Sequence, residues 1–459
     1  MSRTLSAIFI FVIIGFLEAQ QPTPPAQPVS IGMHVSEGPG AAFHFTKEDN
    51  EVLVEADAVD AQYEEKGRVL HDPGLQAYID AVGNRVLGGR PVPEKATYRF
   101  LVLSNPMVNA FALANGSVYI TTGFLALLES EAQLAGVLGH ETAHIYERHP
   151  YLENRSERKK TAALEIIAAA ATFVPGGYAS WLAATVGLNV SDLLIVESIY
   201  GYSRDLESQA DRDGLAAMTA AGYDPHAMAD AFELLDHNST LEYEPHPTFY
   251  HDHPKLKKRQ EEALACADAH TAASARAALK MDYLKAVAPV IVSNIGSDLE
   301  SRRPRTALAR AVRLVDAFPG VAQYRVLLGD SYRALGAKTT VPTPYELSAE
   351  GEAWQRNMAL KMTEQEEQAA LLKISGGPAT LKENQAKAEE AFLAAMESDP
   401  KYAPAYRELG FLYQDESRFA EAALNYRHYL QLAADTSLDR LRITRRLAEV
   451  EKLKAAQPH

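Results

Sequence analysis

Cysteine is nearly absent, since the 459 residues include only Cys266, which stands between Ala265 and Ala267. A lone cysteine forms no disulfide within the chain, so we interpret Cys266 as a residue packed in an apolar core. Basic residues are also few, because 45 lysines and arginines stand against 60 aspartates and glutamates, for a net charge of −15. This acidic balance argues against nucleic acid as the main partner.

Long apolar runs are missing as well, since a membrane-spanning helix needs about 20 apolar residues with few or no charges. Leu5–Leu17 is apolar but short, and it follows a basic start and precedes Ala19. We predict a secretory signal peptide over residues 1–19 and a linker rich in proline and glycine over residues 20–45. The alternative is that the apolar run stays uncleaved as a membrane anchor.

Two later apolar stretches each carry a carboxylate, Glu165 in the first and Asp192 in the second. They predict a pair of helices within residues 161–196. Three roles stay open for this pair: packing on the core, covering a cleft, or touching a membrane surface.

The most specific motif is H-E-x-x-H at His140, Glu141 and His144, which follows a segment with the composition of an amphipathic helix. On a helix, the two histidines leave the same face one turn apart, so both imidazoles can reach a zinc ion at roughly 2.0–2.1 Å. Glu141 lies about 100° round the helix, where it can accept a proton from the water that zinc activates. His149 falls off the ligand face, and we interpret it as a supporting residue.

A third zinc ligand is expected from a later helix. Glu207 and Asp211 are four residues apart, so they share one helix face. Glu207 can complete a His-His-Glu ligand set, Asp211 can hold a ligand imidazole, and Arg204 can steady the Glu207 carboxylate. A solvated charged face is the alternative interpretation of this segment.

Three short strands are predicted ahead of the zinc-binding helix, at residues 98–103, 109–113 and 117–122, with Asn115-Gly116 as a hairpin turn. An open sheet edge can pair with an extended peptide. The predicted substrate-binding residues are therefore those of the second strand, Asn109, Ala110, Phe111 and Ala112. A hairpin that supports the helix is the alternative, and the two roles are compatible.

The motifs together resemble the gluzincin peptidase family that includes HtpX, the CAAX prenyl proteases, the mitochondrial Oma-type protease and the BepA-like proteins. The matching segments, spread over most of residues 50–265, are Asn109-Ala110-Phe111, residues 116–123, His140 to His144 with His149, Arg204-x-x-Glu207-x-x-x-Asp211-x-x-Gly214, and residues 221–225. The resemblance implies a zincin-like metallopeptidase fold. It also implies that His140, His144 and Glu207 bind one zinc ion and that Glu141 is the catalytic base.

A histidine-rich segment follows, and its His253-Pro254-x-x-x-x-Arg259 pattern resembles the H-P-x-x-x-x-R of the same family. The resemblance implies that His253 can approach the zinc and hold the enzyme latent, and that Arg259 lines the site. A neutral imidazole that displaces the zinc water would remove the nucleophile. His246 and His251 are alternatives for this role, and so is a histidine-rich surface loop.

Beyond about residue 270 the pattern is one helix after another, and a 34-residue repeat can be laid down. The matching positions are Ala307, Leu314, Pro319, Leu328, Gly329, Tyr332, Ala388, Phe392, Ala395, Pro400, Tyr406, Leu409, Gly410, Tyr413, Ala422 and Tyr426. They predict tetratricopeptide repeats, which stack into an α-solenoid with a surface for peptides or partner proteins. A segment at about 337–382 interrupts the repeats.

These patterns predict a mainly α fold with a small β-sheet, in which a zinc metallopeptidase domain at 46–270 precedes a repeat domain at 271–459. The predicted function is hydrolysis of unfolded or misassembled envelope proteins in the periplasm, with one zinc ion per chain. The resemblance to BepA-like proteins implies that the repeats engage substrates and the outer-membrane assembly machinery. The rivals are a latent protease that acts mainly as a chaperone or assembly adaptor, and an enzyme anchored in the inner membrane.

Overall fold

The computed structural model describes residues 44–155, 202, 204–241, 256–268, 280–336, 378–434 and 438–456. Several predictions lie outside these ranges. They are the signal peptide at 1–19, almost all of the linker at 20–45, the apolar pair at 161–196, the histidines at 246, 251 and 253, and most of the interruption at 337–382.

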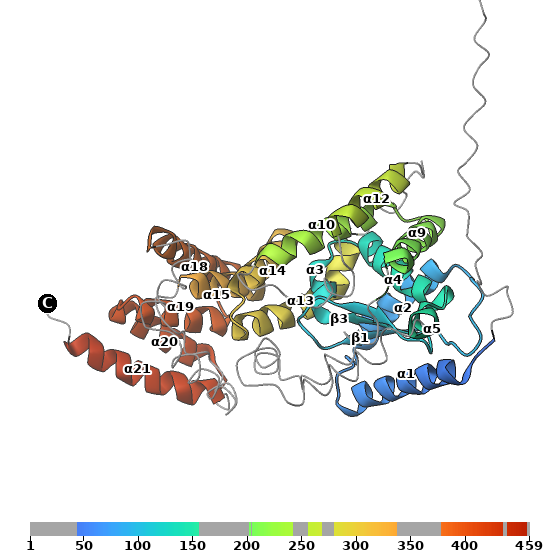
Figure 1. Ribbon diagram of the computed structural model, residues 1–459. Helices are drawn as coiled ribbons and strands as arrows, with labels where there is room; N and C mark the ends of the chain where they lie inside the picture. Colours follow the sequence, from blue (N-terminus) through green and yellow to red (C-terminus); the bar gives the residue numbers. More distant parts are fainter. Residues whose placement is uncertain are drawn as a thin grey trace, which may run out of the picture. The chain divides into compact units, whose positions relative to one another are not determined.

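The first part of the described chain is helical around one small sheet (Figure 1). Its elements are α1 (Lys47–Glu65), α2 (Pro73–Leu87), β1 (Arg99–Leu103), β2 (Ala110–Ala112), β3 (Ser117–Thr121), α3 (Thr122–Leu127), α4 (Glu131–Tyr146), α5 (His149–Arg155), α9 (Arg204–Ala220), α10 (His226–Leu241) and α12 (Leu256–Asp268). The predicted combination of many helices with a small sheet is confirmed.

The sheet has the strand order β1-β3-β2, with β1 parallel and β2 antiparallel to β3. The predicted hairpin joins β2 to β3 and turns at Gly116, whose φ is +100°. A side chain there would be strained by that angle, and its Cβ would also lie 2.3 Å from the carbonyl oxygen of Thr97. Glycine is therefore required at this turn.

The two faces of the sheet belong to two different apolar clusters. Val118 and Ile120 join the cluster that contains α2, α4, α9 and α10 residues, whereas Tyr119 joins the cluster built with α1. Successive side chains on a strand point to opposite faces, so strand β3 contributes side chains to both apolar clusters. Helix α4 thereby packs against the sheet and is buried from Glu131 to Ile145.

The N-terminus of α4 is fixed by polar contacts. Ser130 caps it, accepting a hydrogen bond from the backbone of Gln133. The buried Glu131 carboxylate accepts hydrogen bonds from Tyr78, at 2.7 Å, and from Arg85 and Tyr223, at 2.6 Å each. A buried carboxylate needs such partners, and these contacts tie α4 to α2 and to the turn after α9.

The second part of the described chain consists of helices. They are α13 (Lys280–Glu300), α14 (Pro304–Ala317), α15 (Ala322–Leu335), α18 (Pro378–Ser398), α19 (Ala403–Asp415), α20 (Phe419–Leu432) and α21 (Leu438–Ala456). Each of them packs against the next one described. Helix α18 begins at Pro378, so the end of the predicted interruption is helical.

Two glycines allow close helix contacts in this part. A Cβ on Gly329 of α15 would lie 2.3 Å from the ring of Phe392 on α18, and a Cβ on Gly410 of α19 would lie 2.5 Å from the ring of Tyr426 on α20. All four residues are positions of the predicted repeat. Each glycine therefore makes room for an aromatic ring of a neighbouring helix.

Helices α13 and α14 share the core of the sheet-containing part. Tyr283, Ile291 and Leu314 belong to its apolar cluster, and Asn294 donates a hydrogen bond of 2.9 Å to the carbonyl of Thr122. The apolar cluster of the later helices begins with Ala322. The predicted domain border at residue 270 thus falls ahead of two helices that pack on the first core.

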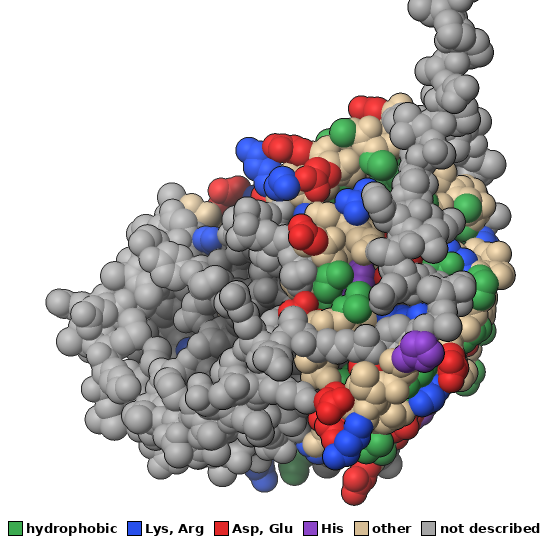
Figure 2. Space-filling view, turned by 45° about the vertical axis from the view of Figure 1, so that its right-hand side comes forward, with side chains coloured by type: hydrophobic (Ala, Val, Ile, Leu, Met, Phe, Trp, Pro, Cys, Tyr) green, Lys and Arg blue, Asp and Glu red, His purple; other side chains and the backbone are tan. Residues whose placement is uncertain are grey.

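The described surface is mixed in charge on the face shown in Figure 2, where acidic and basic side chains are interspersed. In the described part of the chain, no helix has both the length and the apolar content of a membrane span.

Candidate metal centre

Helices α4 and α9 bring three metal-ligating side chains together. The Nε2 atoms of His140 and His144 lie 3.0 Å apart. The Glu207 carboxylate lies 3.6 Å from Nε2 of His140 and 3.4 Å from Nε2 of His144. All three residues are buried, at 3%, 0% and 3% exposure, so the ligand atoms face one another in a site shielded from solvent.

This donor set fits zinc. A tetrahedral site with bonds of roughly 2.0–2.1 Å has edges of about 3.3–3.4 Å between ligand atoms. The two imidazole nitrogens, 3.0 Å apart, are close to that edge length. Each histidine faces its own oxygen of Glu207, and one ligand atom from each of the three residues lies within 4.8 Å of the others, close enough to share one ion. Two imidazoles and one carboxylate are also the ligand types of catalytic zinc sites that keep one position for water.

Two glycines let α4 and α9 approach closely enough to form the site. A Cβ on Gly214 would lie 2.6 Å from the backbone nitrogen of His140, and a Cβ on Gly139 would lie 2.8 Å from the carbonyl oxygen of Gly214. Backbone atoms cannot move aside as a flexible side chain can. The close helix contact, and with it the position of Glu207 opposite the histidines, therefore depends on these glycines.

Asp211 and Arg259 support His140 from behind. Nδ1 of His140 lies 2.9 Å from Asp211, and Arg259 donates two hydrogen bonds to the same carboxylate, at 2.7 and 2.6 Å. Burial lowers the pKa of His140, but the Asp211 hydrogen bond and the Glu207 charge outweigh it and raise that pKa. Burial raises the pKa of Asp211, but Arg259 and His140 hold it well below its ordinary value. A charged Asp211 fixes the proton on Nδ1 and directs Nε2 toward the metal position.

Arg259 also reaches the ligand carboxylate, because its Nη1 lies 3.2 Å from Glu207. Burial lowers the pKa of Arg259, but the charges of Asp211, Glu207 and Glu141 outweigh it, so that pKa lies above its ordinary value. The guanidinium thus stays charged among three carboxylates. It contacts Asp211 and Glu207 directly, and its charge also interacts with that of Glu141.

His144 is supported differently, by a neutral chain of hydrogen bonds. Its Nδ1 lies 2.9 Å from Nδ1 of His149, and Nε2 of His149 lies 3.4 Å from the amide oxygen of Gln209. Gln209 in turn donates to Glu147 at 2.8 Å. Burial lowers the pKa of His149 to about 4, so its ring is neutral and can accept at one nitrogen and donate at the other. A residue that supports His144, the role predicted for His149, needs contacts of this kind.

Tyr202 completes the wall around His144. The two rings are stacked, with centroids 4.0 Å apart and an angle of 17° between their planes. No sequence pattern predicted a site role for Tyr202 or Gln209. Their positions beside the Arg204-x-x-Glu207 segment are the only signal that the sequence offers for them.

Removing the amide of Gln209 is expected to weaken zinc binding by up to about tenfold, the lower end of the range for direct partners of metal-bound histidines, because Gln209 acts on His144 only through His149. Gln209→Leu keeps the side-chain size but leaves the His149 ring without its acceptor. Isothermal titration of zinc into the variant measures the change. Ser208→Ala is the control on the same helix, and equal affinity in all three proteins would show that the chain does not tune the site.

Glu141 lies beside the triad and is buried at 1% exposure. It follows His140 directly on α4, so it is offset by about 100° from the ligand face, as the helix geometry predicts. The α4 main chain therefore holds the candidate base next to the metal position without making it a ligand.

The candidate substrate-binding strand is β2, an edge strand of the sheet. Asn109 accepts a backbone hydrogen bond of 2.9 Å from Thr121, and Leu113 donates one of 2.8 Å to Ser117. Antiparallel pairing alternates, so the backbone groups of Ala110 and Ala112 point away from β3. Both alanines are only 1% exposed, so a substrate strand can pair there only after this edge is uncovered.

Two predicted site residues lack a described side chain. Arg204 begins α9, but its side chain is not among the described groups, and His253 lies outside the described residues. Their predicted roles therefore stay predictions.

Comparison with known proteins matches residues 73–267 to the model of Peptidase family M48. The β-barrel assembly-enhancing protease of Escherichia coli K12 is 26% identical over 195 residues, which are 42% of this chain and 39% of that protein. A Vibrio cholerae protein provisionally given the same name is 28% identical over 265 residues, 58% of this chain and 53% of that protein. The mitochondrial metalloendopeptidase OMA1 of Schizosaccharomyces pombe is 33% identical over 182 residues, 40% of this chain and 50% of that protein.

The chain thus spans about half or less of the length of each of these relatives. The matched segment runs from the start of α2 into α12 and contains every residue of the metal centre described above. Residues 73–267 of this chain therefore belong to peptidase family M48, and they carry the His-His-Glu triad of a zinc metallopeptidase.

Proposed function

We propose that the chain is a zinc endopeptidase that cleaves unfolded or misassembled proteins of the bacterial envelope. The observation that carries the proposal is the donor set of His140, His144 and Glu207, whose ligand atoms lie within 4.8 Å of one another beside a buried Glu141. A purely structural zinc site has four protein ligands, whereas three protein ligands leave a position for water.

Zinc bound by this triad supplies a Lewis acid that acidifies water and polarises a carbonyl. Glu141 then has two tasks: it accepts the proton of the attacking water and returns it to the leaving amine. Its carboxylate is buried beside the ligand triad, where its charge interacts with that of Arg259. Asp211 and His149 hold the two ligand imidazoles in one tautomer while the proton moves.

The substrate backbone is expected to add to the sheet at β2, using the outward groups of Ala110 and Ala112. Only an extended chain can pair in this way, so folded proteins are excluded and unfolded or stalled ones are favoured. The name of the Escherichia coli relative, a β-barrel assembly-enhancing protease, supports proteins that assemble into β-barrels as the substrate class. The periplasm as the location and the outer-membrane assembly machinery as a partner are parts of this proposal that rest on the resemblance to BepA-like proteins.

We further propose that α14, α15 and α18 to α21 belong to tetratricopeptide repeats that bind substrates or partner proteins. The close packing of Gly329 on Phe392 and of Gly410 on Tyr426 supports this, because both pairs occupy repeat positions. Consecutive helices that pack on their neighbours are what such an array requires.

The test is chelator-sensitive cleavage of a denatured protein by purified full-length chain. The zinc-loaded protein should degrade casein, lose this activity in 1,10-phenanthroline and regain it when zinc is added back. Zinc-loaded protein that cleaves neither casein nor an unfolded outer-membrane protein would reject the proposal.

A second candidate function is that of a chaperone or assembly adaptor whose peptidase site is mostly held shut. The low exposure of the ligands and of the β2 edge favours it. It predicts that Glu141→Gln still prevents aggregation of an unfolded outer-membrane protein in a light-scattering assay. A chain without residues 378–459, which keeps the helices that pack on the first core, should not prevent it. Loss of that effect in Glu141→Gln alone would reject this candidate.

A further inference from the structure

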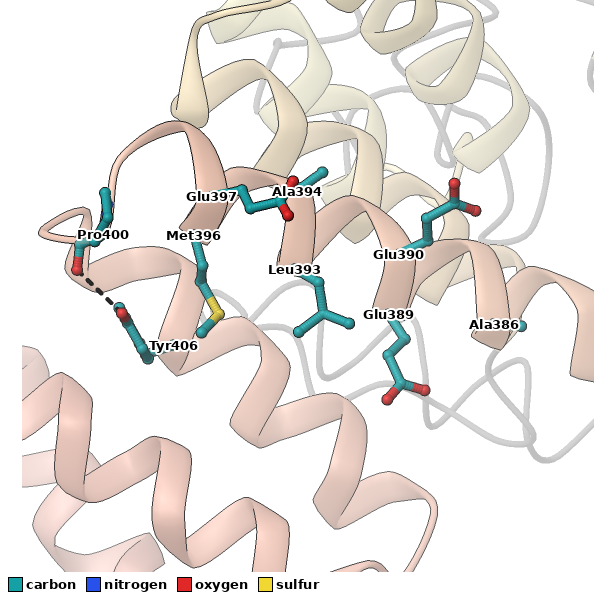
Figure 3. Close-up of a pocket in the computed structure, with 9 residues that line it drawn as sticks. All are labelled: Ala386, Glu389, Glu390, Leu393, Ala394, Met396, Glu397, Pro400 and Tyr406. Carbon is teal, nitrogen blue, oxygen red and sulfur yellow. Dashed lines mark hydrogen bonds between the residues drawn. The ribbon is translucent and has the colours of Figure 1, made fainter.

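An open groove of about 990 Å³ lies along α18 and reaches Tyr406 of α19. Figure 3 shows Glu389, Leu393 and Met396 projecting from the same side of α18, with Pro400 and Tyr406 at one end. Tyr406 donates a hydrogen bond of 3.0 Å to the carbonyl of Pro400, which fixes that end. The groove is large and open, and so suits a segment of polypeptide better than an enclosed small molecule.

Helix α18 has a packed face and an exposed apolar residue on the other side. Ala388, Phe392 and Ala395 are fully buried in the apolar cluster of the later helices. Leu393 is instead 45% exposed, and Met396 beside it is half-buried. Exposed apolar side chains in a groove are typical of a contact surface.

Acidic residues flank that leucine on the helix. Glu389 precedes Leu393 by four residues, Glu390 by three, and Glu397 follows it by four, so all three neighbour it on the helix surface. All three line the groove. The apolar strip is therefore bordered by carboxylates along its length.

The three carboxylates differ in whether a neighbouring cation already pairs with them. Glu389 accepts hydrogen bonds from Tyr413 at 2.7 Å and from Arg418 at 3.0 and 3.2 Å, so an arginine already balances it. Glu390 and Glu397 form no ion pair with any residue in the described ranges, and Lys387 nearby bonds to Glu383 at 2.8 Å. Two exposed carboxylates thus remain to attract a cationic ligand.

We propose that this groove binds a basic segment of the polypeptides that the peptidase domain cleaves, one with an apolar residue flanked by lysine or arginine. The inference rests on the proposed function, since it gives the repeats a substrate class. The apolar side chain packs on Leu393 and Met396, and the basic ones lie against Glu390 and Glu397. An acidic segment would meet like charge at both positions and is disfavoured.

The test is binding of a fluorescein-labelled 14-residue peptide with leucine and lysine at helical spacing, measured by anisotropy on full-length Glu141→Gln protein so that the probe is not cleaved. The lysine peptide is expected to bind, and a glutamate-for-lysine version is not. Glu390→Lys/Glu397→Lys should weaken binding at least about tenfold, because attraction becomes repulsion at two sites. Leu393→Ser should also weaken it, because it removes the apolar contact without changing the charge of the groove.

The matched control is Glu65→Lys/Glu94→Lys, which makes the same change in net charge at exposed positions outside the groove. It should bind like the parent, and circular dichroism checks that every variant is folded. Equal binding of both peptides, or equal loss in the control, would overturn the proposal. Casein cleavage is measured separately with Glu141 in place, so a protein that binds the lysine peptide but never cleaves would refute the proposed function and leave the groove assignment standing.

Discussion

Glu141→Gln is expected to lower peptide hydrolysis by about 100- to 10,000-fold, the range that one positioned general acid–base group contributes. Glutamine has the same shape as glutamate but accepts no proton near neutral pH. The substitution is isosteric inside a buried site, so the fold and the zinc content should stay unchanged. Cleavage rates of casein, together with zinc content and thermal unfolding, measure all three properties.

Glu141→Gln should differ from the parent only in the ability of residue 141 to accept a proton, so lost activity can be assigned to that step. Glu94→Gln is the control, since Glu94 is exposed in a loop ahead of the sheet. It should cleave casein at the parent rate. Full activity in Glu141→Gln would show that Glu141 is not the catalytic base. Loss of zinc would mean that Glu141 is a zinc ligand or positions a zinc ligand.

Gly214→Ala is expected to damage both stability and the metal centre. The new methyl would lie 2.6 Å from the backbone nitrogen of His140 and 2.9 Å from the carbonyl carbon of Gly139, so α9 must move away from α4. Overpacking of this kind typically costs about 1–3 kcal/mol of the free energy of unfolding. Misplacement of catalytic groups by about 1 Å can lower activity about 100-fold, and Glu207 on α9 moves with its helix.

The matched control is Gly296→Ala in α13, where a Cβ meets nothing within 4 Å. Alanine is the better helix former, by about 0.8–1 kcal/mol, so this variant should be as stable as the parent or more so. Thermal unfolding and zinc titration of both variants give the comparison. Gly214→Ala protein with parent stability and zinc affinity would show that the close helix contact is not needed.

Sequence patterns predicted the features that depend only on the spacing of residues within one helix or one hairpin. The two histidines and Glu141 share one helix, and Glu207 and Asp211 share another, so their helical spacing predicts which side chains lie together. The turn at Gly116 followed from the residues of the hairpin, and the structure has the three predicted strands. The strand pairing, with β3 in the middle, depends on the whole sheet and was not predicted.

Contacts between residues of different helices could not be predicted from the sequence. His149 reaches Gln209 only because α9 packs on α4, and Tyr202 reaches His144 for the same reason. Arg259 was assigned to the site through a family resemblance alone, and its bonds to Asp211 come from the packing of α12 on α9. Likewise, the helical pattern after residue 270 does not tell which helices pack on the first core, and α13 and α14 do.

Zinc binding by the triad is best tested by the zinc content of the protein, purified without chelator, beside that of Glu207→Ala. About one zinc ion per chain is expected in the parent, since three protein ligands form one site. Little or no zinc is expected in Glu207→Ala, because the two histidines alone then face the metal. A parent without zinc, or a variant that keeps the full amount, would contradict the assignment of the site.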